Sequence, residues 1–138
     1  MYGALDIAVS GMIAQRARYD VTTANIVNQS AILDSKGEVN PYQRRITLFA
    51  PGDPTAKTAE GRRLGVHVAQ IALDQTPFPK AYNPSSPYAD KDGYVPGTNI
   101  NPVIEQVDAM EAGRAYEACA MAAETTKAMM AQGLRLLA

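Results

Sequence analysis

The chain has 138 residues, with 13 Lys plus Arg against 14 Asp plus Glu, so its formal net charge is −1. Because neither sign of charge is in excess, the composition argues against a nucleic-acid surface and against a polybasic membrane anchor. A single Cys and a single His cannot build a disulfide framework, a Cys/His zinc site or a haem attachment motif, so no metal or cofactor is expected.

The N-terminal segment is predicted to form a helix from Gly3 to about Asn28, because it contains no proline. One apolar stripe on this helix recurs every seven residues and consists of Leu5, Met12, Tyr19 and Ile26. A second, narrower stripe on nearly the opposite side consists of Ile7, Ala14 and Val21. One partner cannot cover both stripes, so we expect burial between several neighbours, some of them from other chains. A central position within a single domain is the alternative.

The middle of the chain, residues 31–100, is predicted to be a separate region without long helices, because prolines recur throughout it. Two β-branched-rich runs, Tyr42–Phe49 and Val66–Leu73, predict a β-hairpin joined by a long, mobile loop. Six prolines from Pro77 through Pro102 predict an extended path with tight turns.

The C-terminal region, residues 101–138, is predicted to be one long helix over Pro102–Leu137, with Asn101 as its cap. A seam on this helix consists of Tyr116, Ala120, Ala123, Met130, Leu134 and Leu137. A neighbouring apolar face consists of Val103, Val107, Met110, Met121 and Ala128. The expected fold is therefore mainly α with a small β region. The helices of regions 1–30 and 101–138 pair as an antiparallel coiled coil, and the hairpin and a proline-rich extended segment lie between them in the sequence.

Candidate chemical sites are few. The segment Asp90–Gly93 matches part of a calcium loop, but Tyr88 and Asn99 stand at the first and last ligand positions, so a plain turn is favoured. Cys119 is read as a small buried residue and His67 as a strand residue, rather than as a catalytic pair. The lone His leaves no general base, and no phosphate-binding loop motif is present, so no catalytic residue is expected. These patterns favour an assembly protein.

The sequence also resembles the rod proteins of the bacterial flagellar basal body over nearly its whole length. The stretch Ser10–Arg16, followed by Ala24–Asn28, is similar to the N-terminal signature of flagellar rod, hook and hook-associated proteins. Further motifs resemble the proximal-rod FlgC family specifically. They are Pro41-Tyr42-Gln43-Arg44-Arg45, Pro77-Phe78, Tyr82-Asn83-Pro84, Pro87, Ala89-Asp90, Asp92-Gly93-Tyr94-Val95, Asn99-Ile100-Asn101 and Arg114-Ala115-Tyr116-Glu117-Ala118.

The resemblance implies a non-enzymatic subunit that polymerises beneath the hook into the axial drive shaft that transmits motor torque. It implies export through the flagellar type III apparatus without a cleaved signal peptide, and a place in the periplasm-spanning rod. The implied neighbours are other copies, the other proximal and distal rod proteins, the membrane-supramembrane (MS) ring and the export-gate adaptor. It implies neither nucleic-acid binding nor direct membrane insertion. A free-standing coiled-coil adaptor is the alternative function.

The apolar patterns add an assembly hypothesis. The first stripe of the N-terminal helix is expected to pack on the C-terminal seam of the same chain, and the second stripe to face adjacent subunits. Asn25 and Asn28 are included in the expected interface. Because isolated helices with uncovered stripes are marginal in water, the free monomer is expected to be largely unfolded and to fold on assembly.

Overall fold

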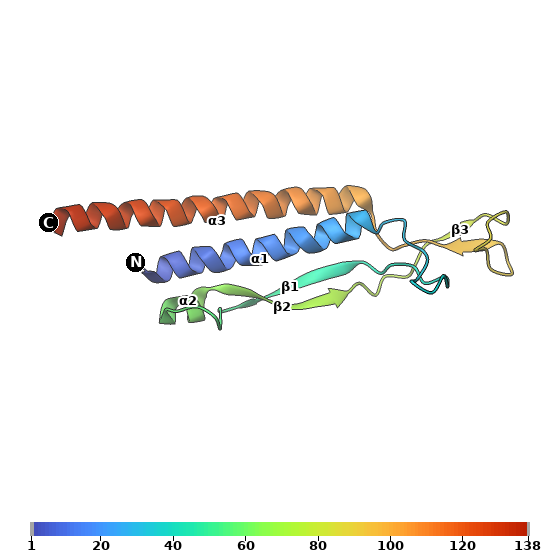
Figure 1. Ribbon diagram of the computed structural model, residues 1–138, viewed down its shortest axis with the longest axis horizontal. Coiled ribbons are helices and arrows are strands. Elements are labelled where there is room, and N and C mark those ends of the chain that lie inside the picture. Colours follow the sequence, from blue (N-terminus) through green and yellow to red (C-terminus); the bar gives the residue numbers. More distant parts are fainter. Residues whose placement is uncertain (1, 138) are drawn as a thin grey trace.

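Two long helices form the body of the molecule. The computed structural model describes residues 2–137, without the side chain of Leu137. Helix α1 (Tyr2–Val27) and helix α3 (Pro102–Leu137) lie side by side and run in opposite directions (Figure 1). The predicted bounds of both helices are confirmed to within about one residue. At its C-terminal end, α3 extends beyond the start of α1 (Figure 1).

A β-ribbon covers the other side of α1. Strands β1 (Arg45–Pro51) and β2 (Val66–Leu73) pair antiparallel, from Arg45↔Leu73 to Pro51↔Val66, with an irregularity after Leu48. Helix α1 contacts α3 and both strands, and lies between α3 and the ribbon (Figure 1). Two elements of its own chain therefore pack on α1, as in the central position considered from the sequence.

The β-ribbon differs from the predicted hairpin in two places, the start of its first strand and the loop between its strands. The first strand begins at Arg45 rather than at Tyr42, because the Tyr42 amide donates to the Ala31 carbonyl at 2.8 Å and the Arg44 amide to Asn99 Oδ1 at 2.8 Å. The loop between the strands contains a short helix, α2 (Ala59–Leu64), where an irregular loop was expected. Thr58 caps this helix by accepting a hydrogen bond from the Gly61 amide at 3.1 Å.

A second small sheet, absent from the sequence prediction, lies beyond the helix ends. Strands β3 (Lys80–Tyr82) and β4 (Tyr94–Pro96) pair antiparallel and form the tip of the molecule (Figure 1). The predicted turn at Asp90–Gly93 is present: Asp90 Oδ1 accepts from the amides of Asp92 and Tyr94, each at 3.0 Å. Gly93 has φ +81°, a backbone conformation that side chains disfavour.

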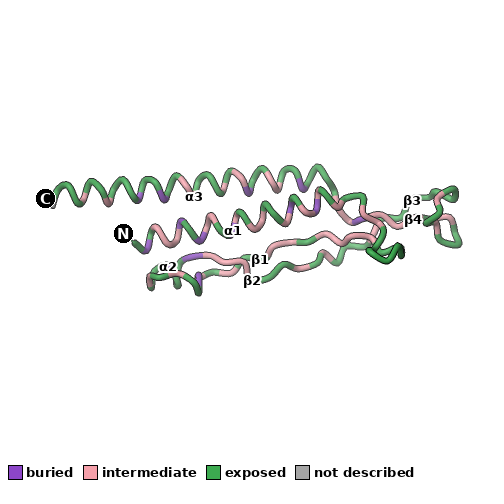
Figure 2. The backbone as a smooth tube through the Cα atoms, viewed as in Figure 1, coloured by how far each residue is buried: buried purple, intermediate pink, exposed green. Residues whose placement is uncertain are grey.

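The interior of the chain contains little apolar material. The buried hydrophobic residues among those described are all alanines, namely Ala8, Ala14, Ala112 and Ala123. The largest fully buried side chains are Glu105, Asn25 and Ser10. Buried positions are sparse along the tube in Figure 2. The subunit is therefore held together by close helix contacts and polar bonds more than by a core of large side chains.

The helix stripes are only partly used as expected. Ala14 is 1% exposed within the chain, so it does not face an adjacent subunit. Tyr19 is 47% exposed and Leu134 68% exposed, so the prediction that both pack between α1 and α3 is wrong. Among the residues of the two predicted stripes and the predicted seam, Ala123 is buried as expected. The half-buried ones are Leu5, Ile7, Met12, Val21, Ile26, Ala120 and Met130. The side chain of Leu137 lies outside the described part of the chain.

Candidate assembly site

Three contacts set the register of α1 against α3. Gly11 lies against Cys119, because a Cβ at Gly11 would come 2.8 Å from the Cys119 sulfur. Two helical turns further along α1, Arg18 Nη2 donates to Asp108 Oδ1 at 3.1 Å. Two turns beyond that, Asn25 Nδ2 donates to Glu105 Oε2 at 2.9 Å. Residues 11, 18 and 25 of α1 therefore form the seam, one position before the predicted stripe. One position rotates a helical face by about 100°, which turns Tyr19 outward.

The predicted seam of α3 differs for the same reason. The buried residues of α3 in the described chain are Glu105, Ala112, Ala123 and Thr126, and of these Ala123 belongs to the predicted seam. Glu105, Ala112 and Thr126 repeat at multiples of seven residues, and Cys119 falls in the same series. These side chains are small or polar, so hydropathy alone does not mark them. Small side chains let two helices approach closely, since the distance between axes depends on the side chains at the contact.

A buried polar junction joins α1, α3 and the ribbon at one end of the helix pair. Asn25 and Glu105 are each 1% exposed, and Asn25 Nδ2 donates to Glu105 Oε2 at 2.9 Å. Asn25 also bonds both backbone groups of Arg45: Nδ2 donates to its carbonyl at 2.8 Å, and Oδ1 accepts from its amide at 3.0 Å. Asn25 therefore fixes the first residue of β1 to the helix pair.

Arg44 supplies the positive charge of the junction. Its Nε donates to Glu105 Oε1 at 2.6 Å, and its Nη atoms lie 3.4 Å from Asp74 and 3.3 Å from Asp108. Burial alone would lower the pKa of Arg44, but the hydrogen bonds and charges of Glu105 and Asp74 raise that pKa above its ordinary value. The guanidinium thus stays charged and compensates the buried carboxylate. Glu105 was not among the candidate residues, since nothing in its sequence surroundings marks it as buried.

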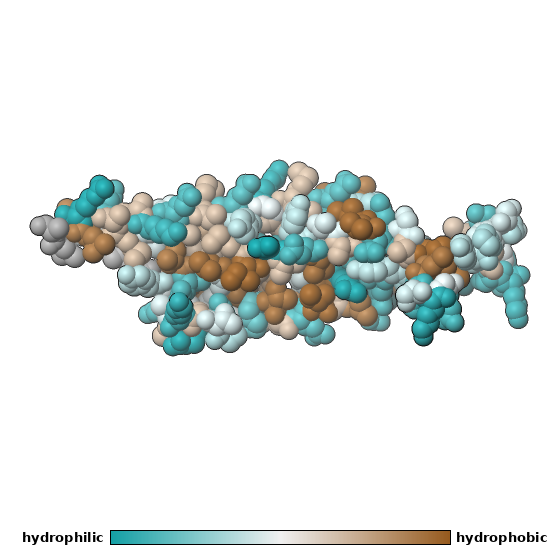
Figure 3. Space-filling model, in the orientation of Figure 1, coloured by the Kyte–Doolittle hydropathy of each residue, from teal (hydrophilic) through white to brown (hydrophobic). Residues whose placement is uncertain are grey.

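Apolar side chains are concentrated on the outside of the subunit. The accessible surface is 9395 Å², whereas a compact monomer of 14.8 kDa exposes about 7,000 Å². Brown apolar patches lie along the helices and the ribbon in Figure 3. Exposed residues of α3 include Val103, Val107, Met110 and Met121, the face predicted beside its seam. Surface of this extent and composition is typical of a subunit that is covered by partners.

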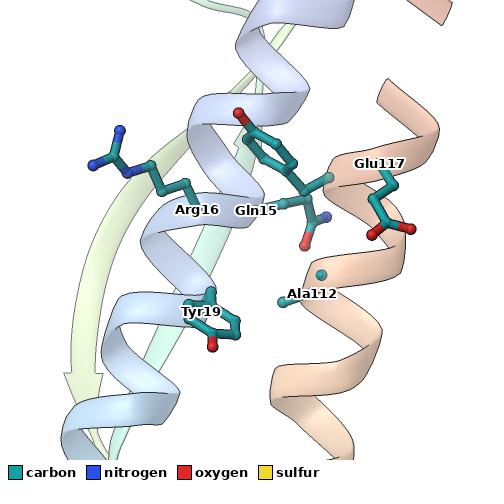
Figure 4. Close-up of a pocket in the computed structure, with 7 residues that line it drawn as sticks. Gln15, Arg16, Tyr19, Ala112 and Glu117 are labelled. Carbon is teal, nitrogen blue, oxygen red and sulfur yellow. The ribbon is translucent and has the colours of Figure 1, made fainter. Parts of the chain in front are cut away.

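An open groove of about 410 Å³ lies between α1 and α3 near their middle (Figure 4). It is lined by Gln15, Arg16, Tyr19, Ala112, Gly113, Tyr116 and Glu117. Tyr19 and Tyr116 are 47% and 41% exposed. The buried Gln15 Oε1 receives no hydrogen bond within the described part of the chain. The groove therefore offers exposed aromatic surface.

The two remaining chemical candidates, His67 and Cys119, lie in packing contacts of the fold. The ring Nδ1 of His67 lies 2.6 Å from the Gly52 carbonyl, and Cys119 lies in the helix seam. The residues that the structure describes include no cluster of three or more potential metal ligands. Across the same residues, the helices are too short or too polar to cross a bilayer.

Comparison with known proteins identifies the family. The model described as "Flagella basal body rod protein" matches residues 5–30, and "Flagellar basal body rod FlgEFG protein C-terminal" matches residues 91–136. The "Flagellar basal-body rod protein FlgC" of Borreliella burgdorferi is 35% identical over 99% of this chain and 97% of its own length. Proteins of the same name from Salmonella typhimurium and Bacillus subtilis are 35% and 30% identical, over 95% and 98% of this chain and 93% and 97% of their own lengths.

The chain belongs to the FlgC family of flagellar basal-body rod proteins. It is a structural subunit of the proximal rod of the flagellum, in a family of structural proteins rather than enzymes. The free-standing adaptor considered from the sequence is set aside, because the similarity to rod proteins extends over nearly the whole chain.

The residues of the wider rod and hook signature, such as Asn25 and Asn28, and those of the FlgC motifs lie in separate places in the fold. Asn25, Arg44 and Asn99 meet at the polar junction, where Asn99 Nδ2 donates to the carbonyls of Asp74 and Thr76, each at 3.2 Å. The guanidinium of Arg45 lies 5.3 Å from the centre of the Tyr42 ring, and Pro41 is half-buried near them. Asn28 Nδ2 donates to the Ala24 carbonyl, and Asn101 Oδ1 caps α3 by accepting from the Val103 amide. Asp92, Gly93 and Tyr94 lie at the tip of the molecule. Arg114 is exposed.

Acid is expected to loosen the loop of this FlgC subunit from α1. The backbone amide of Thr58 donates to Asp6 Oδ2 at 2.9 Å, and hydrogen bonds from the Thr58 side chain and amide hold the pKa of Asp6 below its ordinary value of 3.8. A lowered pKa stabilises the fold above pH 3.8, and this contribution is lost as the pH falls through the folded-state pKa. The measurement is circular dichroism of protein folded in the presence of an osmolyte, from about pH 5 to pH 2.5. The loss of helical signal in acid should be smaller in Asp6→Asn than in the wild type. Equal losses would contradict this role of Asp6.

Proposed function

We propose that the subunit works as a stiff element of the drive shaft, in which the helix pair lies in the core of the rod and the middle region fixes its position. The observation that carries this proposal is the combination of a rigidly bonded polar junction with an apolar exterior. Interlocked helices resist bending and twisting, because their side chains cannot slide without opening voids. Torque transmission requires this stiffness.

The helix pair is proposed to be an antiparallel coiled coil. This geometry is supported by the seven-residue spacing of the contacts on both helices. The contacts lie at residues 11, 18 and 25 of α1 and at Glu105, Ala112 and Cys119 of α3. The three parts of the chain then have separate roles. Residues 1–30 and 101–138 form the core, and residues 31–100 provide the ribbon and the proline-rich tip that contact neighbours in the rod.

Assembly is proposed to complete folding. With only alanines as buried apolar residues of the described chain, a single copy gains little hydrophobic free energy to offset the conformational entropy of two long helices. A largely unfolded monomer suits passage through the flagellar type III export apparatus, without removal of a signal peptide. The proposed partners in the periplasm-spanning rod are the other proximal and distal rod proteins, the MS ring and the export-gate adaptor.

Purified monomer is expected to show weak helical circular dichroism and no cooperative thermal transition, since folding depends on contacts between subunits. Addition of trimethylamine oxide, which favours burial of surface, should restore the helical signal. A monomer that is fully helical and melts cooperatively without osmolyte would overturn the coupling of folding to assembly.

Complementation tests the function itself. In a strain that lacks its own FlgC, expression of this chain should restore swimming, and the protein should be present in isolated hook–basal bodies. A protein that is exported but absent from the isolated hook–basal bodies would contradict the proposed role in the rod.

A further inference from the structure

We propose that the C-terminal end of α3, residues 129–137, docks in the α1–α3 groove of a second copy of this chain. The inference rests on the proposed function and specifies one contact by which copies join. The groove is the one lined by Gln15, Tyr19 and Tyr116.

The C-terminal end of α3 is not covered within its own chain. Leu134 is 68% exposed and Leu136 is 89% exposed. The register explains their exposure: Gly11 opposes Cys119 in the antiparallel pair, so the start of α1 lies near residue 128 of α3. Beyond that point α3 continues alone, as Figure 1 shows. Two exposed leucines on one helix end are costly in water and cheap to bury against a partner.

The groove has the chemistry that complements this segment. Its aromatic walls provide apolar surface for leucine side chains. Its floor includes Gly113, where an added Cβ would have no atom within 4 Å, so space is free for an incoming side chain.

Charge favours the C-terminal end of α3 as the occupant. Residues 127–137 contain Lys127 and Arg135 and no acidic residue. The groove carries the carboxylate of Glu117, and the side chain of its one basic residue, Arg16, points away from α3 (Figure 4). A cation of the incoming helix can therefore pair with Glu117 or lie over a tyrosine ring.

The contact joins two different surfaces of the same chain. Such a heterologous contact leaves one free groove and one free helix end on every pair, so it repeats without closing unless rotation brings the ends together. This geometry produces an open helical polymer or a layer of a rod.

Disulfide crosslinking in isolated hook–basal bodies tests the proposal. The variant is Gly113→Cys with Leu134→Cys on a Cys119→Ser background. The two new thiols are about 30 Å apart along one helix, because 21 residues separate them, so no disulfide can form within a chain. Oxidation should yield dimers and higher multimers of this chain. The matched control, Gly113→Cys with Tyr82→Cys on the same background, should yield none.

Each other outcome overturns the proposal. Protein that is incorporated but forms no crosslink between Cys residues at 113 and 134 excludes the contact, and a crosslink to a different rod protein excludes a second copy as the occupant. Failure of the proposed function is distinguishable, since the wild-type protein would then be missing from the hook–basal bodies.

Charge reversal gives an independent readout. Glu117→Arg and Arg135→Glu should each reduce swimming, and the double variant should recover it to near the wild-type rate, because the pair is restored with opposite polarity. A double variant that is no better than the single variants would exclude pairing of these two residues.

Discussion

Replacing Glu105 with alanine is expected to destabilise the folded subunit by about 3–5 kcal/mol and to abolish swimming. The change removes the partner of Arg44 Nε at 2.6 Å and of Asn25 Nδ2 at 2.9 Å, and leaves a guanidinium in the junction without its closest carboxylate. The measurement is the osmolyte concentration at the midpoint of helix formation, together with the diameter of the swimming halo in soft agar.

Two further variants serve as controls for Glu105→Ala. Glu111→Ala removes an exposed carboxylate of α3 that lies 3.2 Å from Arg18, and should cost less than about 1 kcal/mol. Glu105→Gln keeps the shape of the side chain without its charge and should fall between the two. If Glu105→Ala and Glu111→Ala had equal midpoints, the junction would not be the anchor of the fold.

Replacing Leu134 with aspartate is expected to abolish rod assembly while leaving the fold of the single chain nearly unchanged. Leu134 is 68% exposed in the single chain, so the substitution should change folding by no more than about 0.5 kcal/mol. In the proposed contact between copies the same position is buried against a partner, where an unpaired carboxylate is costly. Swimming and the yield of hook–basal bodies measure assembly, and the osmolyte midpoint measures folding.

The matched control for this variant is Gln132→Asp. It places the same charge on an exposed position of the same helix end, with nearly the same unfavourable interaction with the helix dipole. It should retain assembly. Equal loss of assembly in both variants would assign the effect to charge at the helix terminus rather than to the apolar contact of Leu134.

The contrast between Tyr19 and Gly11 shows where sequence reasoning reached its limit. A seven-residue apolar stripe containing Tyr19 predicted the face that meets α3, yet the helices meet one position earlier, at Gly11, Arg18 and Asn25. Hydropathy measures the tendency to leave water, but the large apolar side chains of Tyr19 and Leu134 stay exposed in the single chain. The contact within the chain uses small and polar residues, which hydropathy does not rank.

The sequence by itself determined the two long helices, the β-hairpin and the family. Proline placement limits where helices can run, runs rich in β-branched residues identify strands, and motif order carries the family resemblance. These properties depend on neighbours within a few residues or on the order of residues.

Only the tertiary structure decided which faces meet. Arg44 and Glu105 are 61 residues apart, and Asn25 is 80 residues from Glu105. A buried carboxylate is stable only where several elements bring donors to it at once, and that condition depends on the packing of the whole chain. The structure likewise revealed that the ribbon covers the second face of α1, because strand direction and register follow from long-range pairing rather than from local preference.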